Sequence, residues 1–142
     1  MRVRQAEPAD FDRIEALLRA SDLPTRDLRA SPGTFLVAEA GGSVVGAGGV
    51  EGYGTGGLLR SVVVAEGMRG RGYGQALTEQ LERDARSEGV KTLYLLTTTA
   101  AAFFRARGYE TTHQTDVPAQ IRQTTEFSEL CPSAATCLRK RL

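Results

Sequence analysis

Few folds accommodate the sequence RGRGYG in the setting that it has at residues 69–74. It separates an apolar, β-branched run, 58–64, from a run with helical spacing, 75–86. Glycine permits backbone conformations with positive φ and lets a ligand approach the main chain closely. Unpaired amides at a helix N-terminus attract anions, and arginine adds charge-assisted hydrogen bonds to phosphate. The segment is typical of a strand–loop–helix cradle for a pyrophosphate; the alternative is a plain glycine turn with solvated arginines.

Two other phosphate-binding loops do not match this segment. A P-loop ends in Gly-Lys followed by Ser or Thr, whereas Gly74 is followed here by Gln75 and Ala76. A dinucleotide-binding fingerprint requires a third glycine at the position of Gln75. The spacing that does fit is Arg-x-x-Gly-x-Gly, formed by Arg69, Gly72 and Gly74.

The rest of the chain alternates between predicted strands and helices. Apolar alternation and buried runs predict strands at 2–6, 34–40, 43–51, 58–64, 91–97, 109–116 and 136–142. Helical spacing and end signals predict helices from Pro8 to the stop at Leu23-Pro24, over 75–86 and over 100–107. Glycines predict a hairpin turn at 41–42 and a loop at 53–57, 25–33 is a short helical or turn segment, and 117–133 has no assigned structure. Because no linker or repeat divides the chain, residues 1–142 are predicted to form one α/β domain with a mixed sheet.

Composition narrows the class of protein. The length of 142 residues suits a single core, and the net charge of +1 gives no general case for binding nucleic acid or a membrane surface. No apolar run approaches the ~20 residues that span a bilayer, and the N-terminus has no apolar signal core. Two cysteines are too few for a disulfide framework. We therefore expect a cytoplasmic protein.

The motifs resemble those of one family. Arg69, Gly72 and Gly74, placed after LLRSVVVAEG, resemble the acyl-CoA loop of the GNAT superfamily of N-acetyltransferases. PADFDRIEALL is similar to that family's first helix, FLVAEAGGSVVGAGGV to its hairpin, and FFRARGYE to its second signature. The resemblance implies a mostly antiparallel sheet of about six to seven strands, about four flanking helices, and a V-shaped splay between strands 58–64 and 91–97. LLRS, LLTTTAAAFFRARGY and TTEFSELCPSAATCLRK further resemble a subgroup associated with arsenic-resistance operons.

This resemblance implies acetyl-CoA as the co-substrate and direct attack of an amine on the thioester. The strand backbone would hydrogen-bond the pantetheine arm, and an amide near Val62 would polarise the thioester carbonyl. Thr97 stands where the family often has an asparagine. The implied cofactor-binding residues are Val62, Val63, Val64, Arg69, Gly70, Arg71, Gly72, Tyr73, Gly74, Gln75 and Thr97.

Candidate catalytic and acceptor-binding residues follow from position. Glu51 ends the strand before the cofactor strand, so it is predicted to be the general base; the alternative is a solvated strand-end glutamate. Arg60 and Arg122 would suit an anionic, amino-acid-like substrate if they face its pocket, and Glu126 is a further polar candidate. The family's usual tyrosine acid is replaced by Phe104.

Several other side chains have competing interpretations. Hydroxyls of Thr97, Thr98, Thr99 and Tyr94 could replace the missing tyrosine, whereas Tyr109 is predicted to be core and His113 structural. Cys131 and Cys137 match no zinc spacing, and they are predicted to be small buried side chains or thiolate ligands for a metalloid.

The function predicted from these residues is acetylation of a small-molecule amine. Two alternatives use the same scaffold: a non-catalytic acyl-CoA sensor, favoured by the absence of the tyrosine, and a thiol-based metalloid-binding protein. No partner beyond the small molecules is predicted. A homodimer is common in the family, although no residue of this chain indicates one.

Overall fold

The computed structural model describes residues 2–129 and 135–142. The described residues form seven strands in one sheet with the order β1-β2-β3-β4-β5-β7-β6. The strands are β1 Arg2–Gln5, β2 Thr34–Ala40, β3 Ser43–Tyr53, β4 Gly56–Val64, β5 Thr92–Thr97, β6 Glu110–Thr111 and β7 Thr136–Arg141. The helices are α1 Phe11–Ala20, α2 Tyr73–Ser87, α3 Ala101–Arg105, α4 Ala119–Arg122 and α5 Thr125–Glu129. Short 3₁₀ turns lie at η1 Pro8–Asp10, η2 Leu28–Ala30, η3 Glu66–Met68 and η4 Gln114–Asp116.

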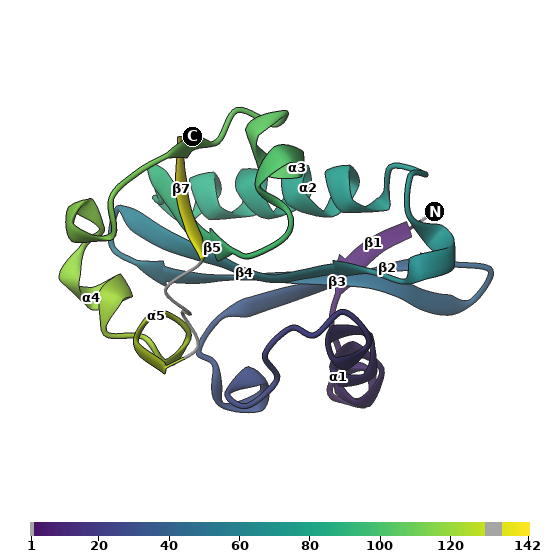
Figure 1. Cartoon of the computed structure of the whole chain (residues 1–142). Helices are drawn as coiled ribbons and strands as arrows, with labels where there is room; N and C mark the ends of the chain where they lie inside the picture. The colour runs from purple at the N-terminus through teal and green to yellow at the C-terminus, as the bar shows by residue number, and fades with distance from the viewer. Residues whose placement is uncertain (1, 130–134) are drawn as a thin grey trace.

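The sheet is mixed and mostly antiparallel, as the sequence predicts. Only β4 and β5 pair in parallel among the described strands. Helix α1 covers one face, α2 and α3 cover the other, and α4 and α5 lie at one end of the sheet (Figure 1). Amphipathic spacing explains the layers, because Ile14, Leu17 and Leu18 of α1 and Leu77 and Leu81 of α2 are all buried in the two main cores. No helix among these residues is long and apolar enough to cross a bilayer.

Three segments differ from the sequence-based expectation. The predicted loop 53–57 is a tight turn, because Gly54 adopts a φ of 69° and lets β3 and β4 extend toward each other. The predicted strand 109–116 is reduced to the two residues of β6, since the chain then turns through η4. The unassigned stretch 117–133 contains α4 and α5 in its described part, to residue 129.

The predicted splay between β4 and β5 is confirmed. Their parallel pairing is limited to Gly56–Leu58 opposite Thr92–Tyr94, and the two strands separate beyond it. On the other side of β4, the register with β3 shifts so that Ser61 and Val62 lie opposite Gly48 alone. This is a β-bulge, and Ser61 has a left-handed φ of 57°. The bulge bends β4 at the point where it has lost β5 as a partner.

Candidate functional site

A cleft of about 1060 Å³ lies between the separated ends of β4 and β5. One wall is formed by 59–64 of β4 and the other by 95–100 at the end of β5. The glycine-arginine loop closes one end, together with residues 20–24 and the side chains of α3. Glu126 and Ala135 line the cleft near Arg60. The splayed sheet therefore creates a continuous opening from the loop to a group of charged side chains.

The loop presents free backbone donors to the cleft. Gly70 and Gly72 have φ values of 77° and 88°, and an added Cβ at either would meet no atom within 4 Å. The first paired amide of α2 is that of Ala76, which donates to Gly72 O at 3.0 Å. The amides of residues 70–75 donate no hydrogen bond to any described residue. A helix N-terminus with several unpaired amides is an anion-binding site, so the geometry fits the predicted phosphate cradle.

The arginines of this region have different roles. Arg69 lines the cleft and ties the loop down, because its Nε donates to Val64 O and its Nη2 to Ser21 Oγ at 3.2 and 2.9 Å. Arg71 is exposed and is not among the lining residues. Arg107, which sequence analysis did not single out, does line the cleft.

Arg107 is held beside the loop by two kinds of contact. Its guanidinium lies 4.0 Å from the centre of the Phe103 ring, and its Nη1 donates to Phe103 O at 2.8 Å. Its Nη2 lies 3.4 Å from Oε1 of Gln75, at the start of α2. The only sequence signal was its place just before Gly108, where no charge is required.

The free edge of β4 offers main-chain groups to the same cleft. The amide of Ala65 donates to Val45 O of β3 at 2.8 Å. Because alternate residues of an antiparallel strand face the same neighbour, Val63 also faces β3 and the groups of Val64 face the opening, where its carbonyl accepts from Arg69 Nε. Val62 lies in the bulge, where this alternation is interrupted. All three predicted valines line the cleft, and the amide of Val64 is placed to bind an extended chain.

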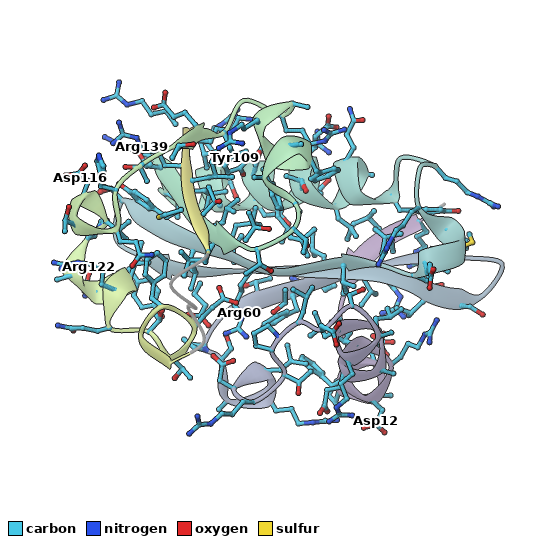
Figure 2. All side chains as sticks on the ribbon, in the orientation of Figure 1. Asp12, Arg60, Tyr109, Asp116, Arg122 and Arg139 are labelled. Carbon is cyan, nitrogen blue, oxygen red and sulfur yellow. The ribbon has the colours of Figure 1, made fainter. Side chains whose placement is uncertain are left out.

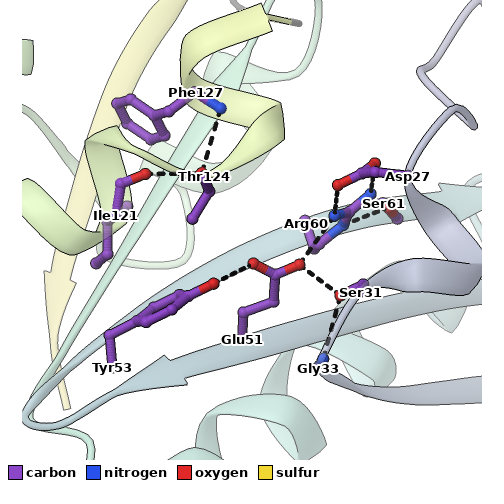
Figure 3. Close-up of polar contacts among 10 residues, drawn as sticks. All are labelled: Asp27, Ser31, Gly33, Glu51, Tyr53, Arg60, Ser61, Ile121, Thr124 and Phe127. Carbon is purple, nitrogen blue, oxygen red and sulfur yellow. Dashed lines mark hydrogen bonds and ion pairs between the residues drawn. The ribbon is translucent and has the colours of Figure 1, made fainter.

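Arg60 forms the centre of a buried ionic cluster (Figure 3). Its guanidinium makes a two-fold contact with Asp27, with Nη1–Oδ2 and Nη2–Oδ1 distances of 2.6 and 2.7 Å. Its Nη1 also donates to Glu51 Oε2 at 2.9 Å, and its Nε to Ser61 Oγ at 3.1 Å. The hydrogen bond from Arg60 lowers the pKa of Asp27. Four of the five N–H donors of Arg60 have acceptors within the protein, two of them carboxylates, which argues against the predicted contact with an anionic substrate.

Glu51 is an acceptor inside this cluster. It accepts hydrogen bonds from the hydroxyl of Ser31, from Tyr53 at 2.7 Å and from Arg60. Its side chain is 3% exposed, and it is not among the residues that line the cleft. Burial, followed by the contact with Glu51, raises the pKa of Tyr53. This arrangement suits a residue that positions Arg60 and does not favour one that receives a proton from a substrate.

Glu126 differs from Asp22 and Glu66, the other carboxylates that line the cleft, because it is buried there, and it has no ion-pair partner among the described residues. It lies on α5, is 9% exposed, and its Oε2 has no hydrogen-bond partner among the described residues. Burial raises its pKa to about 7; Arg60 opposes this effect, and Asp27 and Glu51 add to it. A carboxyl group with a pKa near neutrality suits proton transfer.

The remaining predicted residues are distributed between the cleft and the rest of the fold. Arg122 is exposed on α4, donates to Val117 O at 3.0 Å and lies outside the cleft lining (Figure 2). The structure therefore does not bring it together with Arg60. His113 is also exposed and outside the lining. Cys137 is buried on β7, and Cys131 lies outside the described residues.

The end of β5 and helix α3 bring aromatic and hydroxyl side chains to the cleft. Thr97 lines it, and its Oγ1 accepts a hydrogen bond from the amide of Ala100 at 2.9 Å. Phe104 lines it as well and packs edge-on against Phe103 and Tyr109. The hydroxyl of Tyr109 instead donates to buried Glu82 Oε2 at 2.8 Å, away from the cleft. Tyr109 is therefore a core residue.

Comparison with known proteins finds sequences that are similar to parts of this chain. A family model described as an acetyltransferase (GNAT) domain matches residues 31–111. The amino-acid acetyltransferase of Pseudomonas fluorescens is 41% identical over 63 residues, which are 44% of this chain and 15% of that protein. Mouse N-alpha-acetyltransferase 80 is 43% identical over 53 residues, which are 37% of this chain and 17% of that protein. The chain thus matches only a small part of each curated relative.

Solved structures match along the whole chain. Rv2747 from Mycobacterium tuberculosis, solved in complex with CoA, has a TM-score of 0.84 and 25% identity, covering 100% of this chain and 99% of that one. The N-acetylglutamate synthase of Neisseria gonorrhoeae, solved with coenzyme A and N-acetyl-glutamate, has a TM-score of 0.86 and 23% identity. That match covers 99% of this chain and 35% of the synthase chain, and it is a likeness of fold.

Proposed function

Because this chain belongs to the acetyltransferase (GNAT) family, we propose that it transfers the acetyl group of acetyl-CoA to the amine of a small molecule. The observation that carries the proposal is the continuity of the cleft. It joins the unpaired amides of residues 70–75 to the free edge of β4 and then to the cluster around Arg60 and Glu126. A long, flexible molecule with phosphates at one end and a thioester at the other matches this sequence of surfaces.

Each part of the cleft has a proposed task. The amides of the loop bind the pyrophosphate, with Arg69 and Arg107 adding positive charge beside them. Main-chain groups of Val62 and Val64 hydrogen-bond the pantetheine arm as a strand would. An amide beside the bulge polarises the thioester carbonyl and stabilises the negative charge that develops on its oxygen. Thr97, the last residue of β5, lines the opposite wall beside the arm.

The acceptor is proposed to be a primary amine that lies at the inner end of the cleft. Its nitrogen attacks the carbonyl carbon directly, the C–N bond forms, the C–S bond breaks, and CoA leaves as the thiolate. Matched segments of a protein named amino-acid acetyltransferase support an amino-acid-like acceptor. The tail that resembles the arsenic-associated subgroup makes an amine-bearing arsenical the second class to test.

Release of free thiol from acetyl-CoA tests this proposal over a panel of amino acids, simple amines and amine-bearing arsenicals. Mass spectrometry of the product locates the acetyl group. Thiol release that depends on an amine, with one acetyl group on its nitrogen, is the expected result. Binding of acetyl-CoA by calorimetry without turnover over the whole panel would favour the sensor. Arsenite binding that is lost on alkylation of the cysteines, without turnover, would favour the metalloid-binding alternative.

The aromatic ring of Phe104 gives a prediction about the leaving group. A free thiol has a pKa of ~8.5, so CoA can depart as an anion near neutral pH without a tyrosine acid. We therefore expect Phe104→Tyr to change turnover by less than about tenfold. Steady-state kinetics at pH 7 and 9 measure this, with Phe103→Tyr as a neighbouring control. An increase of a hundredfold or more would mean that the natural protein lacks an essential acid, which would favour the sensor.

A further inference from the structure

The charges at the inner end of the cleft do not balance. Asp27, Glu51 and Glu126 bring three carboxyl groups around the single guanidinium of Arg60. Arg60 is fully buried and forms its ion pairs with Asp27 and Glu51. Glu126 has no ion pair among the described residues and interacts with Arg60 only at longer range. When Glu126 is ionised, the cluster thus has excess negative charge on the side that faces the cleft.

A buried carboxylate oxygen without a donor is costly, because it has lost its water and gained nothing in exchange. Glu51 shows how such a group is normally satisfied, since it receives three donors from its own protein. Oε2 of Glu126 receives none from the described residues and borders the cleft. Because Oε2 borders the cleft, a molecule that occupies the cleft can supply the donor that the described residues do not. A cation with N–H groups meets both needs.

We propose that Glu126 is the group that binds the acceptor's ammonium and removes its proton, beside the ion pairs that Arg60 forms with Asp27 and Glu51. This inference rests on the proposed acetyl transfer. The ammonium donates to Oε2 of Glu126 and gives it one proton, which leaves a neutral amine. The amine attacks the thioester carbon, loses a second proton to the departing thiolate, and becomes the amide. Glu126 then returns its proton to solvent, so that the sum is ammonium plus thioester to amide, thiol and one proton.

The acceptor needs a base because very little of an amine is neutral at pH 7. An amine with a pKa of ~10.4 is only about 0.04% neutral at pH 7. The environment of Glu126 holds its pKa at about 7, so a useful fraction is ionised at neutral pH and still basic. The titratable and charged groups near it are Arg60 of β4, Glu51 and Tyr53 of β3, and Asp27 before η2. The acceptor class that follows is an amine that arrives protonated.

Glu126→Gln is expected to lower kcat by roughly 10²–10⁴-fold while the affinity for acetyl-CoA is kept. The matched control is Glu82→Gln, since Glu82 is a buried glutamate that contacts Tyr109 and Lys140, outside the cleft. That control is expected to retain turnover. Wild-type turnover in the Glu126 variant would overturn the proposal. So would a loss confined to Glu51→Gln, since it would transfer the role to Glu51.

A measurement on the unmodified protein supports the variants. With an acceptor whose own pKa lies well above 9, kcat/KM is expected to rise with pH through a group of apparent pKa near 7 and then to level off. The rise of kcat/KM near pH 7 is expected to disappear in Glu126→Gln. A profile that follows only the ionisation of the acceptor would overturn the role of Glu126. If no amine is acetylated by the unmodified protein, the proposed function itself fails, which is a distinguishable result.

The same side chain predicts a pH-dependent change in stability. The pKa of Glu126 is about 7 in the folded state and ~4.3 in the unfolded state. The free energy of unfolding therefore falls as pH rises from ~4.3 toward 7, because ionisation of Glu126 is easier in the unfolded chain. Glu126→Gln removes this ionisation, so we expect the variant to melt at a higher temperature than the unmodified protein at pH 8. The difference is expected to shrink below pH 5. Thermal unfolding followed by circular dichroism at both pH values measures it, and an equal or lower melting temperature at pH 8 would contradict the unpaired burial.

Discussion

Replacing Arg60 with methionine is expected to destabilise the protein by about 3–5 kcal/mol at pH 7. Methionine retains most of the length of the side chain but removes the charge that satisfies two carboxylates. Asp27 would lose both of its contacts to the guanidinium, and Glu51 would lose one of its three donors. A domain of this kind has only ~5–15 kcal/mol of stability, so the variant is expected to be marginally folded. Urea unfolding gives the free energy and the m-value.

The control for this substitution is Arg29→Met. Arg29 also contacts two carboxylates, Asp12 and Glu15, but its side chain is 53% exposed. Solvent screening limits such a surface pair to ~0–1 kcal/mol. The pH dependence of the stability difference between Arg60→Met and the unmodified protein gives a second test. Arg60 depresses the pKa of Asp27, so its stabilising effect is present above an Asp value of ~3.9 and is lost as pH falls below it. Arg60→Met should therefore differ less from the unmodified protein at pH 3, and equal costs for the two variants at pH 7 would contradict the burial.

Gly72→Val is expected to weaken acetyl-CoA binding by about a hundredfold or more. Gly72 has a φ of 88° at the first turn of α2, a conformation that a β-branched residue adopts only with strain. Relief of that strain would turn the amides of the loop away from the phosphates. Loss of one or two hydrogen bonds to a charged group costs ~1.5–3 kcal/mol each, which gives this factor.

Gly42→Val is the matched control, because Gly42 has a φ of 82° and equally open surroundings in the turn between β2 and β3. It carries the same backbone strain far from the loop, so it should lower stability by a similar amount and leave affinity unchanged. Calorimetry at a temperature where both variants are folded compares them. Equal affinities for acetyl-CoA in the two variants would mean that the loop does not hold the phosphates.

The elements that depend on local chemistry could be predicted from the sequence. The loop at 69–74, its helix and the two strands beside it follow from glycine spacing and apolar periodicity over short distances. The splay between β4 and β5 followed from the family resemblance. The bulge did not, because Ser61 is not a residue type that usually adopts a positive φ. Its conformation is imposed by the register between β3 and β4.

The ionic cluster was harder to predict because its members are far apart in the chain. Glu51 was singled out for its position at the end of a strand, but only the pairing of β3 with β4 brings it to Arg60. Asp27 lies in a segment with no clear periodicity, and nothing local indicates that it faces Arg60. Glu126 lies in a stretch that had no assigned structure, so its burial and its missing partner could only come from the fold.

The three-residue contact between β4 and β5 also bears on aggregation. A strand edge with unpaired amides and carbonyls is normally a template for strands of other molecules. Here the exposed edge, beyond Leu58, lies inside the sheet and faces the wall formed by the end of β5. Another polypeptide has no flat approach to it, because a strand carries side chains above and below its plane. The pantetheine arm is narrower than a strand with its side chains, so the protein keeps an open edge for its co-substrate without offering one to its own copies.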